Sequence, residues 1–500
     1  MSIFYLAGLA GTGKTSVAIT LCRMLQDEPN IVLGGAFFCS RTANVTELTD
    51  ARCVLPTLAV ALAAKSPDFA AALATVLNED PLAASKPITV QIGILLQRPL
   101  TGIPPSSHPI VFVIDAIDEC NDENEVKKLL QAISTFASSA KVKFIITSRP
   151  ETHINASPIS REDQNSILRL HTIDTREVMD DIRLYVNNAF SRQPLDQAWY
   201  TNSDVDLLAA RADGLFIFAH TVVKYVLDTD TVADRMARLQ TAAFAMKDSK
   251  VATGPLDSIY EFVLTRASDS AKVEPKELQA TQQILACILM ARMPLSIATL
   301  AEIVGRKPDV LRASLRRLHA VVNVPDNFDH PGLRTVHASF GDYLFERAAA
   351  DLRIAAALGD ESLFRGCIQV LHRRLYFNVS QSQTAYRSNT SLRPETVTPS
   401  VEYACLQWTY HLAGLRQPGS FDQEINEIFL PRFLFWMELM SVLSQVQRAA
   451  AMLIFAANKV RHPNMRRSEK PHISHVGAVN RACTLSARCQ RLCCFVSGSY

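Results

Sequence analysis

The sequence lacks an apolar run long enough to cross a membrane. Such a helix needs about 18 or more consecutive apolar residues, and the best candidate, around 284–304, is interrupted by Arg292 and Pro294. The N-terminus begins Met-Ser-Ile-Phe-Tyr-Leu with no basic segment, so it does not resemble a secretory signal. We therefore expect a cytoplasmic protein without membrane attachment, whose eleven cysteines remain reduced thiols.

The chain also has little net charge and no internal repeat. Its 51 basic and 49 acidic residues give +2 over 500 residues, but the two signs are unevenly distributed. Residues 459–500 hold eight Lys/Arg and one Glu, or +7, so the preceding part carries −5. An acidic body argues against direct nucleic-acid binding. The absence of a period of 20–50 residues excludes solenoids and propellers, and the length predicts two to four domains.

The order of apolar patterns predicts an α/β domain followed by helical domains. Short apolar runs alternate with helix-compatible stretches over the first 150 residues, which is typical of a parallel sheet flanked by helices. From about Thr175 the apolar residues recur at helical spacing. Beyond residue 284, three helices and a hairpin are expected, the pattern of a winged-helix domain. Strands are expected at 3–6, 36–38, 110–114 and 144–146, with both faces covered because their hydrophobicity is continuous.

A glycine-rich motif directly follows the first expected strand. Residues 8–15 read GLAGTGKT and match G-x-x-x-x-G-K-[ST], a loop whose backbone N–H groups wrap around phosphates. Lys14 would neutralise the β/γ oxygens, and the Thr15 hydroxyl would ligate Mg²⁺. The alternative is a strand–helix turn that binds nothing. The expected nucleotide-binding residues are Gly8, Leu9, Ala10, Gly11, Thr12, Gly13, Lys14, Thr15 and Ser16.

Two further strands end in residues suited to nucleotide chemistry. The run IVFVIDAIDEC ends in Asp115, the expected Mg²⁺-coordinating carboxylate of a Walker B strand. Asp118 or Glu119 would orient the hydrolytic water as general base, with Asp118 favoured. The alternative for these acids is a solvated turn that caps the next helix. Arg149, at the end of KFIITSRP, would sense the γ-phosphate, or it is simply solvated.

The order of these motifs resembles the fungal NACHT-domain NTPases of the STAND class, the nucleotide-switch module of NOD-like receptor proteins, with a nephrocystin-like N-terminal domain. The similarity covers residues 3 to about 457. It rests on the phosphate loop, on FVIDAIDEC as the D-[GAS]-x-D-E motif, on FIITSRPETHI as the sensor strand, and on later segments such as MPLSIATLAEIVG and VHASFGDYLFE.

This resemblance implies a switch that binds ATP or ADP with Mg²⁺, hydrolyses slowly and oligomerises through its nucleotide-binding domain when ATP replaces ADP. It implies that His337 contacts the β-phosphate of ADP. The alternative is a histidine packed and hydrogen-bonded in the wing. A role in non-self recognition or programmed cell death would follow. The alternative function is a non-hydrolysing interaction module, or a truncated product, that pairs with full-length relatives.

The resemblance also divides the chain. Family members usually carry an effector segment before the loop and sensor repeats after the helical region, and neither is recognisable here. The basic tail contains four cysteines, but their spacing with His472 and His475 fits no zinc pattern. Disorder or a misread splice junction is expected there. The expected parts are a nucleotide-binding domain at 1–172, a helical domain at 173–282, a winged-helix domain at 283–350, a helical region at 351–457 and the tail at 458–500.

Overall fold

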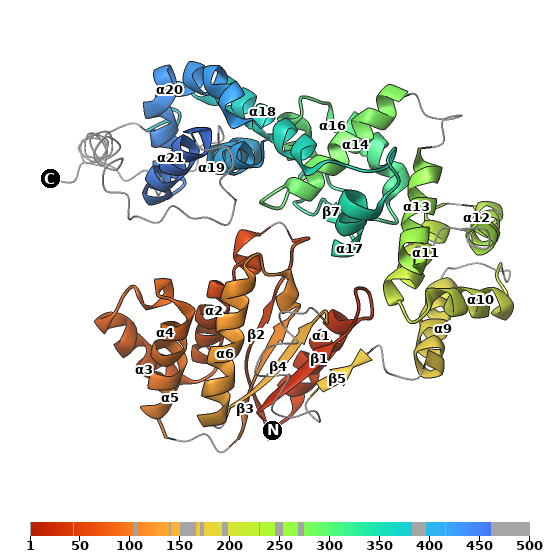
Figure 1. Ribbon diagram of the computed structural model, residues 1–500, viewed down its shortest axis with the longest axis horizontal. Helices are drawn as coiled ribbons and strands as arrows, with labels where there is room; N and C mark the ends of the chain where they lie inside the picture. Colours follow the sequence, from red (N-terminus) through yellow and green to blue (C-terminus); the bar gives the residue numbers. More distant parts are fainter. Residues whose placement is uncertain are drawn as a thin grey trace. The chain divides into compact units, whose positions relative to one another are not determined.

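The computed structural model places most of the chain in two compact units. It describes residues 2–43, 45–104, 108–139, 142–150, 167–170, 175–192, 199–229, 231–245, 254–268, 275–382, 397–415 and 417–461. Unit 1 comprises residues 1–267 with the short segments 319–321 and 336–343, and unit 2 comprises the remainder. Figure 1 labels the helices and strands of the two units.

Unit 1 is built on a five-stranded parallel sheet with the order β2-β3-β4-β1-β5. In this order β1 lies between β4 and β5, so the loop that follows β1 emerges inside the sheet rather than at its edge. The carboxyl ends of β1, β3 and β4 carry Gly8, Asp115 and Arg149. The strands are β1 (Ile3–Ala7), β2 (Val32–Phe38), β3 (Ile110–Asp115), β4 (Val142–Ser148) and β5 (Ile167–Arg169).

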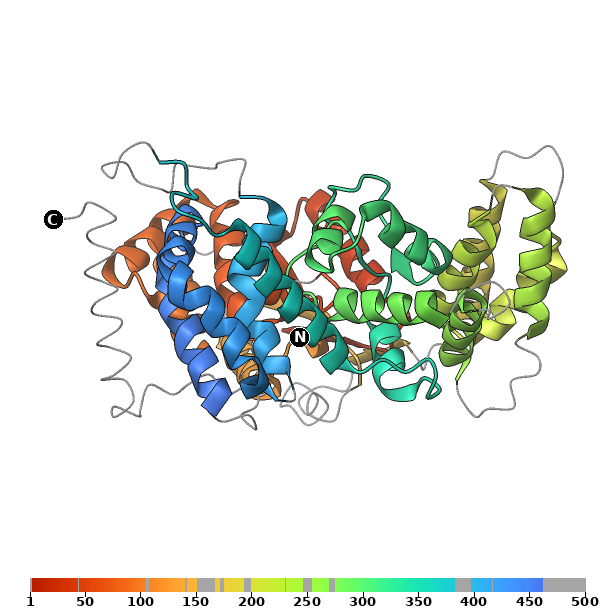
Figure 2. The same cartoon turned by 90° about the horizontal axis from the view of Figure 1, so that it is seen from above.

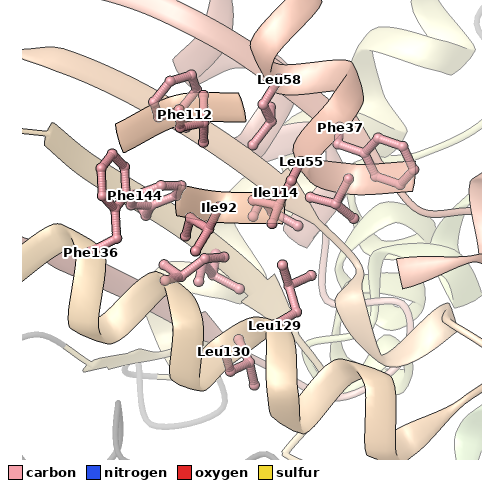
Figure 3. Packing of buried hydrophobic residues seen from close by; sticks show 14 of the residues in the cluster. Phe37, Leu55, Leu58, Ile92, Phe112, Ile114, Leu129, Leu130, Phe136 and Phe144 are labelled. Carbon is pink, nitrogen blue, oxygen red and sulfur yellow. The ribbon is translucent and has the colours of Figure 1, made fainter. Parts of the chain in front are cut away.

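Helices cover both faces of the sheet, as the continuous apolar strands predict. Every residue of β3 is buried, and its side chains alternate between the two faces. Val113 packs on one face with Ala18 of α1 (Lys14–Asp27), whereas Phe112 and Ile114 belong to the larger core on the other face. Figure 3 shows this core, in which Phe112 stacks on Phe144 at 5.2 Å between ring centroids. The helices contributing to it are α2 (Val54–Ala63), α3 (Pro67–Glu79), α4 (Ile88–Ile92), α5 (Arg98–Thr101) and α6 (Glu123–Ser139).

A helical segment completes unit 1. Its first helix, α9, buries Ile182 and Val186 on one face, as the spacing of its apolar residues predicts. The side chain of Thr201 and that of Asp204 cap α10 reciprocally, which fixes where that helix begins. The segment consists of α9 (Thr175–Ser191), α10 (Asn202–Ala212), α11 (Phe216–Leu227), α12 (Val232–Ala245) and α13 (Pro255–Ala267).

Unit 2 is mainly helical. Its first part has three helices followed by a two-stranded antiparallel ladder, β6 (Val322–Asn323) with β7 (Arg334–Thr335). The later helices pack side by side, in blue in Figure 2. Trp408 and Trp436, which these helices carry, are buried. The helices are α14 (Pro275–Met290), α15 (Ile297–Ile303), α16 (Pro308–Leu315), α18 (Ala356–Arg374), α19 (Pro399–Gly414), α20 (Asp422–Val442) and α21 (Val446–Arg461).

These observations confirm the expected fold class, a parallel sheet flanked by helices followed by a helical region. All four expected strands exist, each somewhat longer than predicted, and β5 was not predicted. The winged-helix assignment and the five-part division of the chain stay predictions. None of the described helices has the length and apolar character needed to cross a membrane. Most of the basic tail, with its cysteines and histidines, lies outside the described residues.

Candidate nucleotide-binding site

The glycine-rich loop joins β1 to α1 in the strand–loop–helix arrangement that the motif requires. Gly11 and Gly13 have φ of 82° and 89°, a region that residues with a Cβ rarely adopt. Gly13 caps α1, whose first turn therefore directs its unpaired N–H groups toward the loop. Thr12 steadies the turn because its hydroxyl donates to the Leu9 carbonyl at 2.9 Å. This geometry can hold an anion.

Lys14 lies within the loop rather than in solvent. Its ammonium donates to the carbonyl oxygens of Gly8 at 2.8 Å and Leu9 at 2.9 Å. Burial lowers the pKa of Lys14, while Asp118 acts in the opposite direction and Arg149 in the same one. A buried cation whose ammonium donates to neutral carbonyl oxygens would gain from an arriving phosphate.

Helix α11 covers the loop from the other side. The backbone N–H of Ile217 donates to the Gly11 carbonyl at 3.2 Å. A Cβ on Gly11 would lie 2.0 Å from Cγ2 of Ile217, closer than any real contact, whereas a Cβ on Gly13 would meet nothing nearer than 3.8 Å. The backbone of Gly11 thus approaches α11 so closely that no side chain fits between them. The loop and α11 form one packed surface.

Asp115 and Thr15 meet, as the magnesium prediction requires. Asp115 is 1% exposed, accepts a hydrogen bond from the Thr147 hydroxyl at 2.6 Å and is hydrogen-bonded by Thr15. Burial raises the pKa of Asp115, and the two hydroxyls oppose that shift. Oxygen donors from a carboxylate and a hydroxyl suit Mg²⁺. The residues present therefore fit the ion that the sequence predicts.

Asp118 and Arg149 form a partly buried ion pair. Asp118 lies in the 3₁₀ turn η5 (Ile117–Glu119), and its carboxylate accepts from the Arg149 backbone N–H at 3.0 Å and faces Arg149 Nε at 3.3 Å. The same guanidinium donates through Nη1 to Asp342 at 2.9 Å. Burial acts to lower the pKa of Arg149, but its bond to Asp342 and the charges of Asp342 and Asp118 outweigh it, so the net shift is upward. Arg149 is therefore held between two carboxylates.

Glu119 is held by a residue that the sequence did not single out. The backbone N–H of Arg41 donates to the Glu119 carboxylate at 2.8 Å, and the Arg41 guanidinium donates to the carbonyls of Asp118 and Glu119. Burial raises the pKa of Glu119, and the hydrogen bond from Arg41 opposes that shift. Both candidate bases are thus engaged by arginines in this conformation.

His337 belongs to unit 1 and lies near the same charges. Its Nδ1 accepts the backbone N–H of Ser339, and because that group can only donate, the proton of the neutral ring is on Nε2. Ser339 in turn hydrogen-bonds Tyr260 at 2.9 Å, which fixes the start of α17 (Ala338–Asp342). Burial, with the nearby positive charges of Arg149 and Lys14, lowers the pKa of His337 to about 4. His337 is therefore a neutral donor at pH 7.

The lowered pKa of His337 predicts a pH-dependent stability. Between pH 6.5 and pH 4 the unfolded chain binds a proton that folded His337 does not, so the free energy of unfolding falls as pH falls. Between pH 7 and pH 5 we expect this residue to cost about 2 kcal/mol. Urea unfolding of the wild type and of His337→Gln at both pH values measures it. An equal loss in the two proteins would contradict the prediction.

The structure brings together side chains predicted from four separate segments of the sequence. Lys14, Thr15, Asp115, Asp118, Glu119, Arg149 and His337 are joined by the hydrogen bonds, ion pairs and electrostatic interactions described above. Leu9, Thr15 and Ser16 are exposed. Sequence reasoning missed Arg41, Thr147, Ile217 and Asp342, although Thr147 precedes Arg149 by two residues at the end of the same strand.

Comparison with known families gives one match. Residues 1–149 match the model of the family described as nephrocystin 3, N-terminal, as the sequence resemblance predicted. This segment runs from the first strand through Arg149, so it contains the glycine-rich loop and the acidic motif but not His337. Among curated proteins no relative is found.

Two solved structures are similar in part. One is Cdc6p from Pyrobaculum aerophilum, with 13% sequence identity over 72% of this chain and 87% of that one, at a TM-score of 0.29. The other is Drosophila ORC bound to DNA, with 12% identity over 70% of this chain and 91% of that one, also at 0.29. At these TM-scores neither similarity bears on the function of this chain.

Proposed function

We propose that this protein is a nucleotide-driven switch of the NACHT/STAND class that binds ATP or ADP with Mg²⁺ and hydrolyses ATP slowly. The observation that carries the proposal is the convergence of Lys14, Asp115 and Arg149 beside a loop that exposes backbone N–H groups. These charges lie far apart in the sequence: Lys14 begins α1, Asp115 ends β3 and Arg149 follows β4, and the fold brings them to one site. A signalling role in the cytoplasm, in non-self recognition or programmed cell death of a fungus, is part of the proposal.

Each residue has a distinct task in this proposal. Lys14 leaves the carbonyls of Gly8 and Leu9 to bind the β/γ-phosphate oxygens, and the loop N–H groups bind the others. Thr15 and Asp115 hold Mg²⁺, which supplies charge neutralisation on the phosphates. Asp118 or Glu119 orients the attacking water once its arginine partner is displaced.

The switch depends on which group accepts hydrogen bonds from the guanidinium of Arg149. In the described conformation its Nη1 donates to Asp342. A γ-phosphate would compete with Asp342 for this guanidinium, whereas ADP would leave the pair intact and accept the Nε2 proton of His337. ATP and ADP would therefore contact two conformations unequally, which is what a ligand needs in order to shift an equilibrium. Release of segment 336–343 would then permit homo- or hetero-oligomerisation through the nucleotide-binding domain.

The variant Lys14→Ala tests nucleotide binding. Hydrogen bonds to a charged group contribute about 1.5–3 kcal/mol, so the loss of Lys14 should weaken ADP and ATP binding by roughly 10- to 150-fold. Isothermal titration of the full chain with each nucleotide and Mg²⁺ measures this.

The control for this titration is the variant Lys65→Ala. Lys65 also donates from Nζ to a backbone carbonyl, that of Leu33 at 2.6 Å, but it has no part in the loop. Its removal should leave the affinity unchanged. Equal nucleotide binding by the wild type and Lys14→Ala would refute the proposal.

The second candidate is an interaction module that binds nucleotide without hydrolysing it and pairs with longer relatives. It is favoured by the engagement of Asp118 with Arg149 and of Glu119 with Arg41, since neither acid is free to orient water in this conformation. Turnover measured by phosphate release distinguishes the two candidates. Release that disappears in Asp115→Ala supports the hydrolysing switch, and its absence from the wild type supports the interaction module.

A further inference from the structure

Two buried cysteines flank in sequence the residues that form the contact between Arg41 and Glu119: Cys39 precedes Arg41 by two positions, and Cys120 directly follows Glu119. Cys39 is the first residue after β2, and Cys120 is the first after η5. Their sulfur atoms are 3.6 Å apart, and the two residues are 4% and 5% exposed. The 80 residues between them in sequence include β3, so only the fold brings the two thiols together.

Independent hydrogen bonds hold the two segments that carry these thiols. The backbone N–H of Cys39 donates to the Asp115 carbonyl at 3.0 Å, which fixes Cys39 against β3. On the other side, Asn121 bonds Thr49 twice, through its backbone N–H at 2.9 Å and its side chain at 2.7 Å. The thiols therefore face each other in a fixed arrangement. A disulfide needs the sulfur atoms to approach by about 1.5 Å.

We propose that Cys39 and Cys120 form a reversible disulfide when the protein meets a hydroperoxide, and that this bond locks Arg41 onto the acidic motif. The bond would add a covalent link between the two segments, which hydrogen bonds and core packing already bring together. With the segments joined, Arg41 could not leave Glu119. The coupling to nucleotide turnover rests on the proposed function, whereas formation of the disulfide does not.

The chemistry balances with hydrogen peroxide as the oxidant. One cysteine, as thiolate, attacks a peroxide oxygen, forms a sulfenic acid and releases hydroxide. The other thiol attacks the sulfenic sulfur, its proton leaves with the displaced hydroxyl as water, and the S–S bond forms. Two thiols lose two electrons and two protons, and peroxide becomes two water molecules. A dithiol reductant reverses the bond by exchange.

The same surroundings make this reaction slow. The hydrogen bond to Cys120 and burial raise the pKa of the Cys39 thiol well above its usual range, and the thiolate is the reactive form. Incubation over hours with millimolar peroxide is therefore the appropriate exposure. The thiols of Cys22 and Cys53, also in unit 1, provide an internal comparison because both are more exposed than those of Cys39 and Cys120.

The test uses the full chain, treated with hydrogen peroxide, alkylated with N-ethylmaleimide and digested. We expect one cross-linked peptide pair containing Cys39 and Cys120, which disappears after dithiothreitol and is absent from Cys39→Ala and Cys120→Ala. The matched control Cys53→Ala should still form it. Recovery of both cysteines as alkylated or as sulfinic and sulfonic acids, with no cross-link, would overturn the disulfide.

A second measurement addresses the lock itself. The rate of ATP turnover, or of ADP release if the wild type has no turnover, should fall at least threefold on oxidation and recover with dithiothreitol. Cys120→Ala should lose this response to peroxide while keeping its reduced rate. A cross-linked protein with unchanged rates overturns the lock, and failure to bind any nucleotide would instead be failure of the proposed function.

Discussion

Gly11→Ala is expected to destabilise unit 1 by about 2–5 kcal/mol. The positive φ of Gly11 costs an alanine roughly 1–2 kcal/mol, and forcing a methyl group against a packed neighbour costs about 1–3 kcal/mol more. The added Cβ would lie 2.0 Å from Cγ2 of Ile217, so α11 must move away from the loop. Urea unfolding followed by circular dichroism measures the shift in midpoint. Nucleotide retention should fall with it, because the loop would lose its backbone contact with Ile217.

Two variants separate the close approach from the backbone strain. Gly13→Ala adds the same methyl group at a similar φ of 89°, but nothing lies nearer than 3.8 Å, so only the strain remains. An Ile217→Ala background removes the Cγ2 that would lie 2.0 Å away and leaves the Cβ at 2.9 Å, so the cost of Gly11→Ala should fall toward that of Gly13→Ala. The same cost for Gly11→Ala in both backgrounds would show that α11 does not press on the loop.

Asp360→Ala is expected to destabilise unit 2 by about 1–3 kcal/mol, since it removes a buried hydrogen bond to His411. Asp360 on α18 faces Nδ1 of His411 on α19 at 3.0 Å, and the two side chains are 1% and 0% exposed. Nε2 of the same ring bonds the Tyr403 hydroxyl at 2.8 Å. Asp360 and His411 thus join two neighbouring helices through buried hydrogen bonds.

The next residue on α18 supplies the control. Glu361 pairs with Arg365 one turn away, but both side chains are about half exposed, so Glu361→Ala should cost about 0.5 kcal/mol or less. A Trp199→Phe background leaves only Trp408 and Trp436 of the three tryptophans, and both are buried in unit 2. Their fluorescence then reports the unfolding of unit 2 alone. Similar midpoints for Asp360→Ala and Glu361→Ala would refute the prediction.

The central strands and the candidate site could be predicted because local sequence determines them. The strand β3 is a continuous apolar run that ends in Asp115. Such a run is typical of an interior strand in a sheet whose two faces are both covered. The glycine spacing of residues 8–15 likewise determines a loop with two positive φ angles. The sequence was therefore sufficient to predict the strand β3 and the glycine-rich loop, because neighbouring residues determine the backbone geometry of both.

The partners of these residues could not be predicted, because tertiary structure alone brings them together. Arg41 follows an unremarkable stretch after β2, and nothing in its neighbours indicates that it binds Glu119. Asp342 is separated from Arg149 by 193 positions. The strand β5 has three residues, too few to show a period, and it pairs with β1 only because the sheet edge is available.

The division of the chain has a consequence for how the molecule can be dissected. Segments 319–321 and 336–343 belong to unit 1, but the residues between them, including both strands of the β6–β7 ladder, belong to unit 2. The polypeptide therefore passes more than once between unit 1 and unit 2. A fragment ending at residue 267 would keep the glycine-rich loop and lose His337 and Asp342. A single cleavage of the polypeptide therefore cannot separate the two units. His337 and Asp342 remain covalently joined on both sides to segments of unit 2, so a substitution that unfolds unit 2 is expected to affect the candidate site as well.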